Sequence, residues 1–293
     1  MEILIAGHSV VDHIYRNRKE IVLPGGIYYS ALGFSSISNE NDRLFLLTSS
    51  GEEDYQLFKP IYKQLDLSYI NDFGGLPHVT FFEDGKVKRS PDYSKYIARL
   101  NYEKIDNWKK LNGVYINMIT GFEFDAGDFI DIRKKYKGKI YLDVHTLARA
   151  LTVKNERYFR VIPDYERIIG SVNYVQVNED ELLTITPYDK LEKILETIFK
   201  LGVEILILTQ GKKGVKVFTN EGLAFDFDAV KVESVNRLGC GDVFGSFFFY
   251  LLLEGNKIED VIEKSNFAAA LITTYCNTRE FTRLRNDFFE RYT

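Results

Sequence analysis

Short apolar runs that alternate with helix-like stretches most constrain how this chain can fold. The runs are rich in β-branched residues, have the length of strands, and lie at Ile3–Ala6, Leu44–Thr48, Val114–Ile119, Ile140–Val144, Tyr174–Val177 and Ile205–Thr209. Amphipathic stretches lie between most of them, such as Glu52–Leu65, Ala126–Tyr136 and Lys190–Leu201. Strands that alternate with helices predict an α/β fold with a mostly parallel sheet that helices cover on both faces. Ligands of such sheets bind beyond the carboxyl ends of the strands.

Two regions break this alternation and predict strands outside the main sheet. Asp12–Leu23 alternates apolar and charged residues, and His78–Arg89 reads as a hairpin whose turn contains Asp84-Gly85. We expect these segments, inserted around residues 12–23 and 76–90, to form a small antiparallel sheet of their own. The alternative is a peripheral hairpin without a function.

The end of the predicted sheet contains a further hairpin. Val215–Thr219 and Leu223–Asp228 flank the turn signal Asn220-Glu221-Gly222. The sequence contains no internal repeat, low-complexity tract or interdomain linker. Because α/β folds of this length often form one unit, we expect residues 1–293 to be a single domain.

Composition excludes several functional classes. The chain carries 38 Lys and Arg against 42 Asp and Glu, and no basic block stands out, so nucleic acid is not expected as a ligand. The first residues carry no basic segment before their short apolar run, and no stretch approaches the length of a membrane span. We therefore expect a cytoplasmic protein without a membrane partner. Cys240 and Cys276 are too few for a disulfide framework, and the four histidines show no metal-binding spacing.

The segment from Asn236 to Gly245 carries the strongest chemical signal. It places Gly239, Gly241 and Asp242 just before an unbroken apolar run that suits a buried helix. Glycines let a backbone approach a phosphate closely, and the N–H groups and dipole of a helix start favour its charge. Asp242 could then take a proton from a hydroxyl that attacks the phosphoryl group. The segment read alone is equally compatible with an ordinary turn into a core helix.

With its surroundings, this segment resembles the second signature of the ribokinase family of sugar and nucleoside kinases, the phosphofructokinase-B type. Asn236, Gly239, Gly241 and Asp242 match that pattern. Three residues depart from it: Arg237 replaces a small residue, Cys240 replaces Ala, and Phe247 replaces Gly or Ala. The resemblance implies a three-layer α/β/α fold whose inserted strands form a lid over the acceptor. It also implies a catalytic role for Asp242 and for the backbone of Gly239, Cys240 and Gly241.

Residues near the N-terminus are candidates for acceptor binding. Asp12 follows Gly7, the end of the first predicted strand, by five residues, and a carboxylate there could accept hydrogen bonds from a polyol. Gly25-Gly26 precede a helix-like run and would allow the acceptor to approach closely. Both features resemble acceptor-binding positions of the family. Considered alone, Asp12 could equally be a turn residue, and the glycines a plain turn.

Four later segments resemble the family's nucleotide and magnesium motifs. Asn178 and Glu181 have the family's Asn-x-x-Glu spacing, which implies that they organise Mg²⁺ through water. Helix capping by itself explains the presence of these residue types, but not the match in spacing. Thr209, Gly211 and Gly214 resemble the segment along which the nucleotide phosphates pass. Asn266 lies on a stretch that resembles the helix beside the adenine, and its small neighbours could also serve helix packing alone.

These motifs together predict an ATP-dependent kinase of a hydroxyl on a small sugar, sugar-like molecule or nucleoside. The implied cofactors are ATP and Mg²⁺, and a monovalent cation is left open. The exposed lid face leaves a homodimer open as well. One rival is a binding or regulatory protein on the same fold that has lost catalysis. The other, an NAD-dependent oxidoreductase, lacks its glycine fingerprint, and the chain has no P-loop motif either.

Overall fold

A central sheet of eight strands organises the computed structural model, which describes residues 1–16, 18–82, 86–90 and 92–292. The strand order is β16-β15-β14-β13-β10-β9-β1-β4, and neighbouring strands pair in parallel except at one edge, where β15 runs antiparallel to both β14 and β16. The strands are β1 Glu2–Ala6, β4 Arg43–Leu47, β9 Gly113–Asn117, β10 Lys139–Asp143, β13 Tyr174–Asn178, β14 Ile205–Thr209, β15 Val215–Thr219 and β16 Ala224–Phe227. Each apolar run of the sequence forms one strand, and the predicted C-terminal hairpin is confirmed as β15 and β16.

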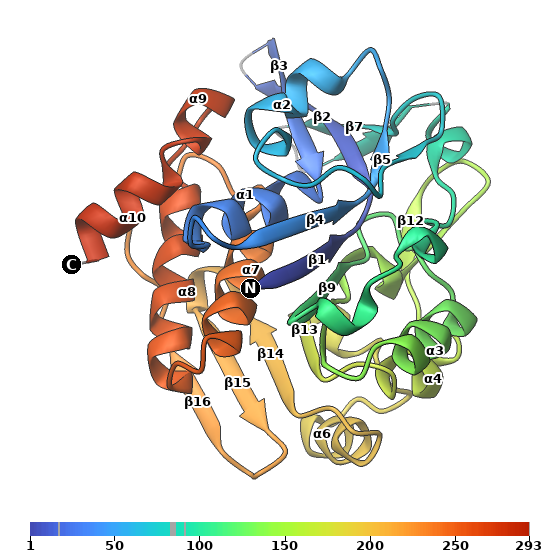
Figure 1. Cartoon of the computed structure of the whole chain (residues 1–293), viewed down its shortest axis with the longest axis vertical. Coiled ribbons are helices and arrows are strands. Elements are labelled where there is room, and N and C mark those ends of the chain that lie inside the picture. Colours follow the sequence, from blue (N-terminus) through green and yellow to red (C-terminus); the bar gives the residue numbers. More distant parts are fainter. Residues whose placement is uncertain (17, 83–85, 91, 293) are drawn as a thin grey trace.

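Helices cover both faces of this sheet (Figure 1). The helices are α1 Tyr28–Ile37, α2 Tyr55–Tyr62, α3 Ala126–Lys135, α4 Tyr165–Ile169, α5 Glu179–Leu182, α6 Leu191–Lys200, α7 Cys240–Leu253, α8 Ile258–Ile272, α9 Thr278–Phe281 and α10 Leu284–Tyr292. Successive side chains of a strand point to opposite faces. Ile3 and Ile5 accordingly join the apolar core with α1, α7 and α8, whereas Leu4 and Ala6 join the core with α3, α4 and α6. The predicted α/β fold with a sheet covered on both faces is confirmed.

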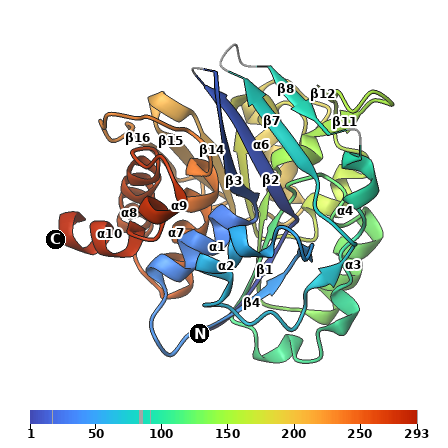
Figure 2. The same ribbon diagram turned by 90° about the horizontal axis from the view of Figure 1, so that it is seen from above.

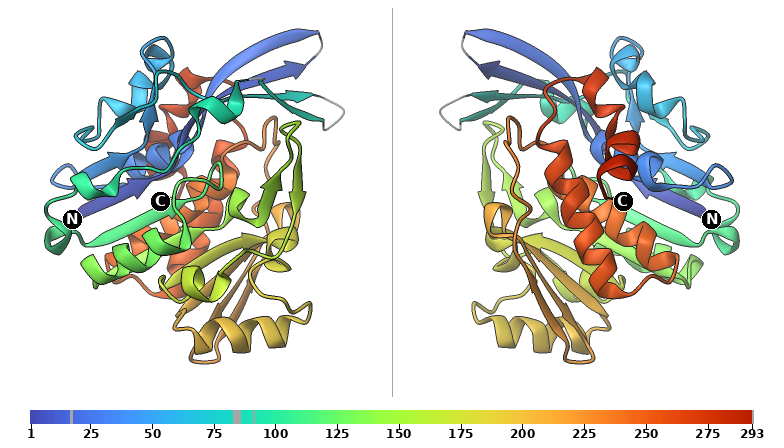
Figure 3. Two further views of the ribbon diagram at one scale, coloured as in Figure 1. Left: turned by 90° about the vertical axis from the view of Figure 1, so that its right-hand side faces the viewer. Right: turned by 90° about the vertical axis from the view of Figure 1, so that its left-hand side faces the viewer.

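A second sheet of four strands stands over one end of the central sheet (Figures 2 and 3). Its order is β3-β2-β7-β8, with β2 Ser9–Arg16, β3 Lys19–Gly26, β7 His78–Phe82 and β8 Val87–Arg89. We call it the lid sheet after its predicted role. The predicted location is right, but the prediction of a purely antiparallel sheet is wrong, because β2 and β7 pair in parallel. The predicted turn Asp84-Gly85 lies outside the described residues, and the single domain stays a prediction.

The remaining strands form two small pairs that the sequence did not reveal. β5 Ser49–Ser50 pairs with β6 Asn71–Asp72, and β11 Arg149–Leu151 forms a hairpin with β12 Arg157–Phe159. This hairpin rises from the central sheet toward the edge of the lid sheet (Figure 3), where Arg89 donates a hydrogen bond to the carbonyl of Asn155. Short 3₁₀ turns lie at Tyr93–Tyr96, Tyr102–Lys104, Trp108–Lys110, His145–Ala148 and Gly211–Lys213. Over the described ranges, none of the helices has both the length and the apolar character of a membrane span.

Candidate active site

The site centres on the start of helix α7, where the glycine-rich segment enters the helix. Gly239 is the N-cap residue and has a φ of 75°, a left-handed conformation that favours glycine. A Cβ at this position would lie 2.2 Å from the ring of Tyr29 on α1, so the chain also passes too close for a side chain. The first N–H groups of α7 have no carbonyl of a preceding turn to bind. These constraints fix a helix start that can receive an anion.

Asp242 lies in the first turn of α7 and is half-buried. Asn117, at the carboxyl end of β9, donates a hydrogen bond of 2.5 Å from its Nδ2 to Oδ1 of Asp242. Burial raises the pKa of Asp242 to about 6, and the hydrogen bonds from Asn117 and Ser30 limit this rise. A carboxyl group with such a pKa is largely ionised at neutral pH and can accept a proton.

Asp12 lies close enough to Asp242 for the two carboxyl groups to interact. Burial, and then the charge of Asp242, raise the pKa of Asp12 to about 8. Asp12 is a residue of strand β2, so the alternative of a turn residue is wrong. Gly25 on β3 pairs with Val10 on β2, and a Cβ at Gly25 would lie 2.1 Å from Oδ2 of Asp12. Gly25 and Gly26 therefore end a strand, and Gly25 leaves the space that the Asp12 carboxyl group occupies.

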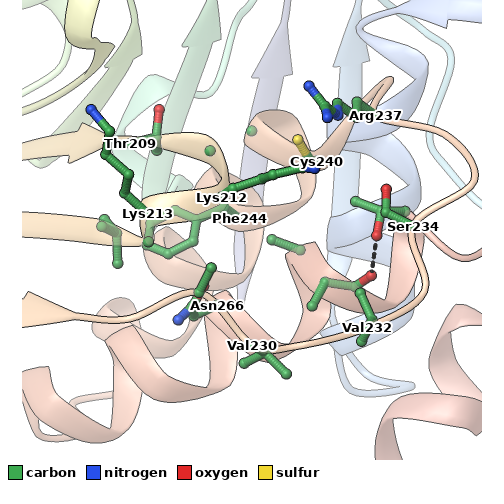
Figure 4. A pocket seen from close by; sticks show the side chains of 18 of the residues that line it. Thr209, Lys212, Lys213, Val230, Val232, Ser234, Arg237, Cys240, Phe244 and Asn266 are labelled. Atoms are coloured by element: carbon green, nitrogen blue, oxygen red, sulfur yellow. Dashed lines mark hydrogen bonds between the residues drawn. The ribbon is translucent and has the colours of Figure 1, made fainter.

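A cavity of about 1030 Å³ opens on the other side of the α7 start (Figure 4). Most of the predicted nucleotide and phosphate residues line it: Asn178, Thr209, Gly211, Gly214, Cys240, Gly241 and Asn266. These residues come from β13, β14, the loop after β14, α7 and α8. Asn266 lines the wall, but its amide already donates a 2.7 Å hydrogen bond to the carbonyl of Asp228. The sheet thus brings together motifs that are far apart in the sequence.

The walls of this cavity combine apolar and cationic side chains. Figure 4 shows Val230 and Val232 of the loop after β16 on the same cavity as Phe244 of α7. Four cationic residues complete the lining: Lys212, Lys213, Lys231 and Arg237. Such a cavity offers apolar contact to a flat ring and positive charge to phosphates.

Asn178 and Glu181 form a capping box at the start of α5. Oδ1 of Asn178 accepts hydrogen bonds from the N–H groups of Asp180 and Glu181, and Oε2 of Glu181 accepts one from the N–H of Asn178. This is the structural alternative that the sequence left open. Burial nevertheless raises the pKa of Glu181 to about 7, and Asn178 lines the cavity. Their role toward Mg²⁺ stays a prediction.

Three polar residues of the site were missed by sequence reasoning. Besides Asn117, these are Asp143 at the end of β10 and Gln176 on β13. Nε2 of Gln176 donates to Oδ2 of Asp143 at 2.9 Å and to the carbonyl of Gly241 at 3.1 Å. Burial, and then the charge of Asp242, raises the pKa of Asp143 well above its usual range. The signal that could have found them is their position, because each is a polar residue at or near the carboxyl end of a buried parallel strand.

The departures from the signature have distinct places in the structure. Phe247 is fully buried and packs against Phe288 of α10, with ring centroids 4.9 Å apart. Arg237 and Cys240 both line the cavity. Phe247 therefore serves the core and does not obstruct the cavity, whereas Arg237 adds a positive charge to it.

Comparisons with known proteins agree with this geometry. Residues 134–283 match the sequence profile of the pfkB family carbohydrate kinases. A 5-dehydro-2-deoxygluconokinase of Listeria innocua is 29% identical over 83 residues, which are 28% of this chain and 26% of that protein. The first relatives therefore match over about a quarter of their length. A cytidine kinase of Thermococcus kodakarensis is 21% identical over 272 residues, 89% of this chain and 92% of that protein.

Solved structures share the fold over the whole chain. A pyrophosphate-dependent kinase of the ribokinase family, complexed with a pyrophosphate analog and myo-inositol, superimposes with a TM-score of 0.80 at 16% identity and covers 99% of both chains. The ribokinase of Thermotoga maritima has a TM-score of 0.72 at 18% identity, again over 99% of both chains. At these identities the superpositions establish the fold, and the profile match covers more than half of the sequence. The chain therefore belongs to the pfkB family of carbohydrate kinases and has the ribokinase-like fold.

Proposed function

We propose that this protein transfers the γ-phosphoryl group of ATP to a hydroxyl group of a small sugar or sugar-like acceptor. The observation that carries the proposal is the position of Asp242. It lies at the start of α7, between the cavity with cationic walls and the Asp12 carboxyl group of the lid sheet. A base between donor and acceptor is the arrangement that phosphoryl transfer to a hydroxyl needs.

In the proposed mechanism, Asp242 accepts the proton of the attacking hydroxyl. Asn117 holds the carboxylate in place through its 2.5 Å hydrogen bond, and the pKa of about 6 keeps it ionised at neutral pH. The N–H groups of Cys240, Gly241 and Asp242 at the helix start face the charge that develops on the transferring group. Asp12, beside Gly25 and Gly26, holds the acceptor hydroxyls, and the lid sheet excludes water that would otherwise be phosphorylated in its place.

The cavity favours a nucleotide as the donor over inorganic pyrophosphate. Its cationic residues suit phosphates in either molecule, but Val230, Val232 and Phe244 form apolar walls that only a base would use. Thr209, Gly211 and Gly214 would lie along the phosphates, and Asn266 would border the base. Mg²⁺, when bound near Asn178 and Glu181, would neutralise phosphate charge, and these residues would hold it through water. A need for a monovalent cation and a homodimer through the lid sheet stay predictions.

A donor and acceptor screen tests the proposal. Purified protein is incubated with Mg²⁺ and either ATP or pyrophosphate, together with a panel of sugars, sugar alcohols, sugar acids, sugar phosphates and nucleosides, and phosphorylated product is measured by mass spectrometry. We expect product with ATP and a member of the sugar classes. Binding of an acceptor without product at any Mg²⁺ concentration would favour the catalytically silent binding protein. Product with pyrophosphate alone would overturn the donor assignment.

A further inference from the structure

Three arginines converge where the lid sheet meets the β11–β12 hairpin. Arg89 is the last residue of β8, Arg149 begins β11 and Arg157 begins β12. Burial lowers the pKa of Arg89, and the nearby charges of Arg157 and Arg149 act in the same direction. Burial and then the charge of Arg149 also lower the pKa of His145 to about 4, so His145 is uncharged at neutral pH and adds no charge to the cluster. The cluster is thus a concentration of positive charge in a chain whose net charge is −4.

These guanidinium groups have few partners. The Nε atoms of all three are buried without a hydrogen-bond acceptor. Within the described ranges, the side chain of Arg149 donates no hydrogen bond; it covers the ring of Phe159, and its charge lowers the pKa of Glu181 on α5 against the effect of burial. Arg157 donates to the carbonyls of Thr120 and Arg149 and to Tyr93. Among the residues that the structure describes, no carboxylate lies within ion-pair distance of any of the three. Like charges that are partly removed from water repel one another, and a bound anion would relieve this cost.

The strand register and a hydrogen bond place two of these arginines, Arg89 and Arg157, on the acceptor side of the site. Asp12 on β2 pairs with Val79 on β7, and Val79 pairs with Arg89 on β8. Paired residues point to the same face of a sheet, so Arg89 shares the face of the lid sheet that presents Asp12. Two strand spacings separate their backbones, which is roughly 10 Å. Arg157 lies in the same region, because it donates a hydrogen bond to the carbonyl of Thr120, which closely follows the carboxyl end of β9.

We propose that Arg89, Arg149 and Arg157 form an anion subsite, and that the acceptor is a sugar carrying an acidic group, either a carboxylate or a phosphate. The inference rests on the proposed function, because it places the acidic end of the acceptor at the cluster and the reacting hydroxyl at Asp242. The planar guanidinium group binds both acids through paired hydrogen bonds, which explains why arginine and not lysine occupies all three positions. A neutral sugar would leave these donors unfilled.

Matched pairs of acceptors test the subsite. Binding is measured by titration calorimetry for gluconate against sorbitol and for fructose 6-phosphate against fructose, because each pair differs mainly in its acidic group. We expect the acidic member of at least one pair to bind roughly 10- to 100-fold more tightly, the range for charge-assisted hydrogen bonds. The better pair also identifies whether carboxylate or phosphate is preferred. Equal binding within both pairs, or no binding of either acid, would overturn the proposal.

Two variants and a control locate the effect. Arg149→Gln removes a guanidinium group that donates no hydrogen bond to the described part of the protein. The variant should therefore lose most of the preference for the acidic acceptor without losing thermal stability. Arg157→Gln should act in the same direction. Arg160→Gln is the matched control, because Arg160 lies just after β12 and is exposed. An Arg149→Gln protein that binds ATP less tightly but keeps its acid preference would assign the cluster to the donor and contradict the proposal.

Product formation separates this inference from the proposed function. If neutral acceptors are phosphorylated and the acids are not, the kinase assignment stands and the anion subsite fails. If an acid binds in an Arg149-dependent manner but yields no product with ATP and Mg²⁺, the subsite stands as a binding site and the kinase assignment fails.

Discussion

Two carboxyl groups, Asp12 and Asp242, define the site at the scale of single residues. Burial raises the pKa of both, to about 8 for Asp12 and about 6 for Asp242. Of the two, only Asp242 accepts a hydrogen bond from Asn117 in the part of the chain that the structure describes, and this bond limits the rise of its pKa, so that Asp242 is ionised first. Such separation of two acid groups is a common way in which a site assigns the role of base.

The raised pKa of Asp12 predicts a dependence of stability on pH. The folded state keeps its proton up to about pH 8, whereas the unfolded state releases it near 3.8, so folding is favoured below pH 4 and loses this contribution as the pH rises to 8. Asp12→Asn lacks the titration. Between pH 5 and pH 8, urea denaturation should show a steeper fall in the free energy of unfolding for the wild type than for the variant. Parallel curves would show that Asp12 is not held protonated.

Substitution by alanine should have different effects at Gly25 and at Gly241. Gly25→Ala places Cβ within 2.1 Å of Asp12, so the carboxyl group must move, and the KM of the acceptor should rise by at least tenfold. At Gly241 the nearest atom is Nε2 of Gln176 at 3.6 Å, an ordinary contact. Gly241→Ala should therefore fold normally and alter only donor kinetics. An unchanged acceptor KM in a folded Gly25→Ala protein would contradict the contact.

Sequence reasoning found the residues of this site that sit in local motifs. Gly239, Gly241 and Asp242 lie within four residues of one another at the start of a helix, so their pattern in the sequence predicts the local geometry. Asn117 and Gln176 could not be found in this way, because their partners Asp242 and Gly241 are 125 and 65 residues away along the chain. Only the packing of α7 across the strand ends creates these contacts.

At the scale of elements, helix α5 has a capping box and a proposed role toward Mg²⁺, and one substitution can separate the two. Glu181→Gln retains the capping box, because Gln can also accept the hydrogen bond from the N–H of Asn178. It removes the charge proposed to organise Mg²⁺. We expect a melting temperature within about 2 °C of the wild type, since the cap is kept. The Mg²⁺ concentration for half-maximal rate should rise severalfold. An unchanged Mg²⁺ requirement would leave α5 with capping alone.

Two phenylalanines of helix α7 should have different roles, Phe247 in stability and Phe244 in donor binding. Phe247 is buried against Phe288 on the side of the helix away from the cavity. Phe247→Ala should lower the free energy of unfolding by roughly 3–5 kcal/mol, the usual cost of deleting a buried ring. Nucleotide affinity of the folded fraction should be unchanged, whereas Phe244→Ala, on the cavity wall, should weaken it. Loss of ATP binding in folded Phe247→Ala would contradict this division.

The elements themselves followed from the sequence more completely than their pairing. The apolar runs gave all the parallel strands of the central sheet, because burial on both faces requires continuous apolar segments. The lid sheet was expected as antiparallel, but β2 and β7 are joined through a long connection and run in the same direction. The β11–β12 hairpin carries no apolar alternation, so the arginines that begin its strands gave no signal.

At the scale of the whole molecule, the fold places the residues proposed for the donor and those proposed for the acceptor on opposite sides of one helix start. The cavity is built from β13, β14 and the chain after them, whereas the lid sheet comes from residues before 90. Strands β9 and β10, in the middle of the sheet order, contribute Asn117 and Asp143 between the two. This separation is the reason that substitutions on one side should leave binding on the other side intact.

The most direct test of the account is the turnover of Asp242→Asn with the acceptor identified by the screen. The variant should fold and bind ATP with wild-type affinity, and its kcat should be lower by roughly 10² to 10⁴, the range for a positioned acid–base group. Wild-type kcat should fall as the pH drops below about 6, because protonation removes the base, and this dependence should disappear in the variant. An Asp242→Asn protein that turns over at nearly the wild-type rate would contradict the assignment of the base.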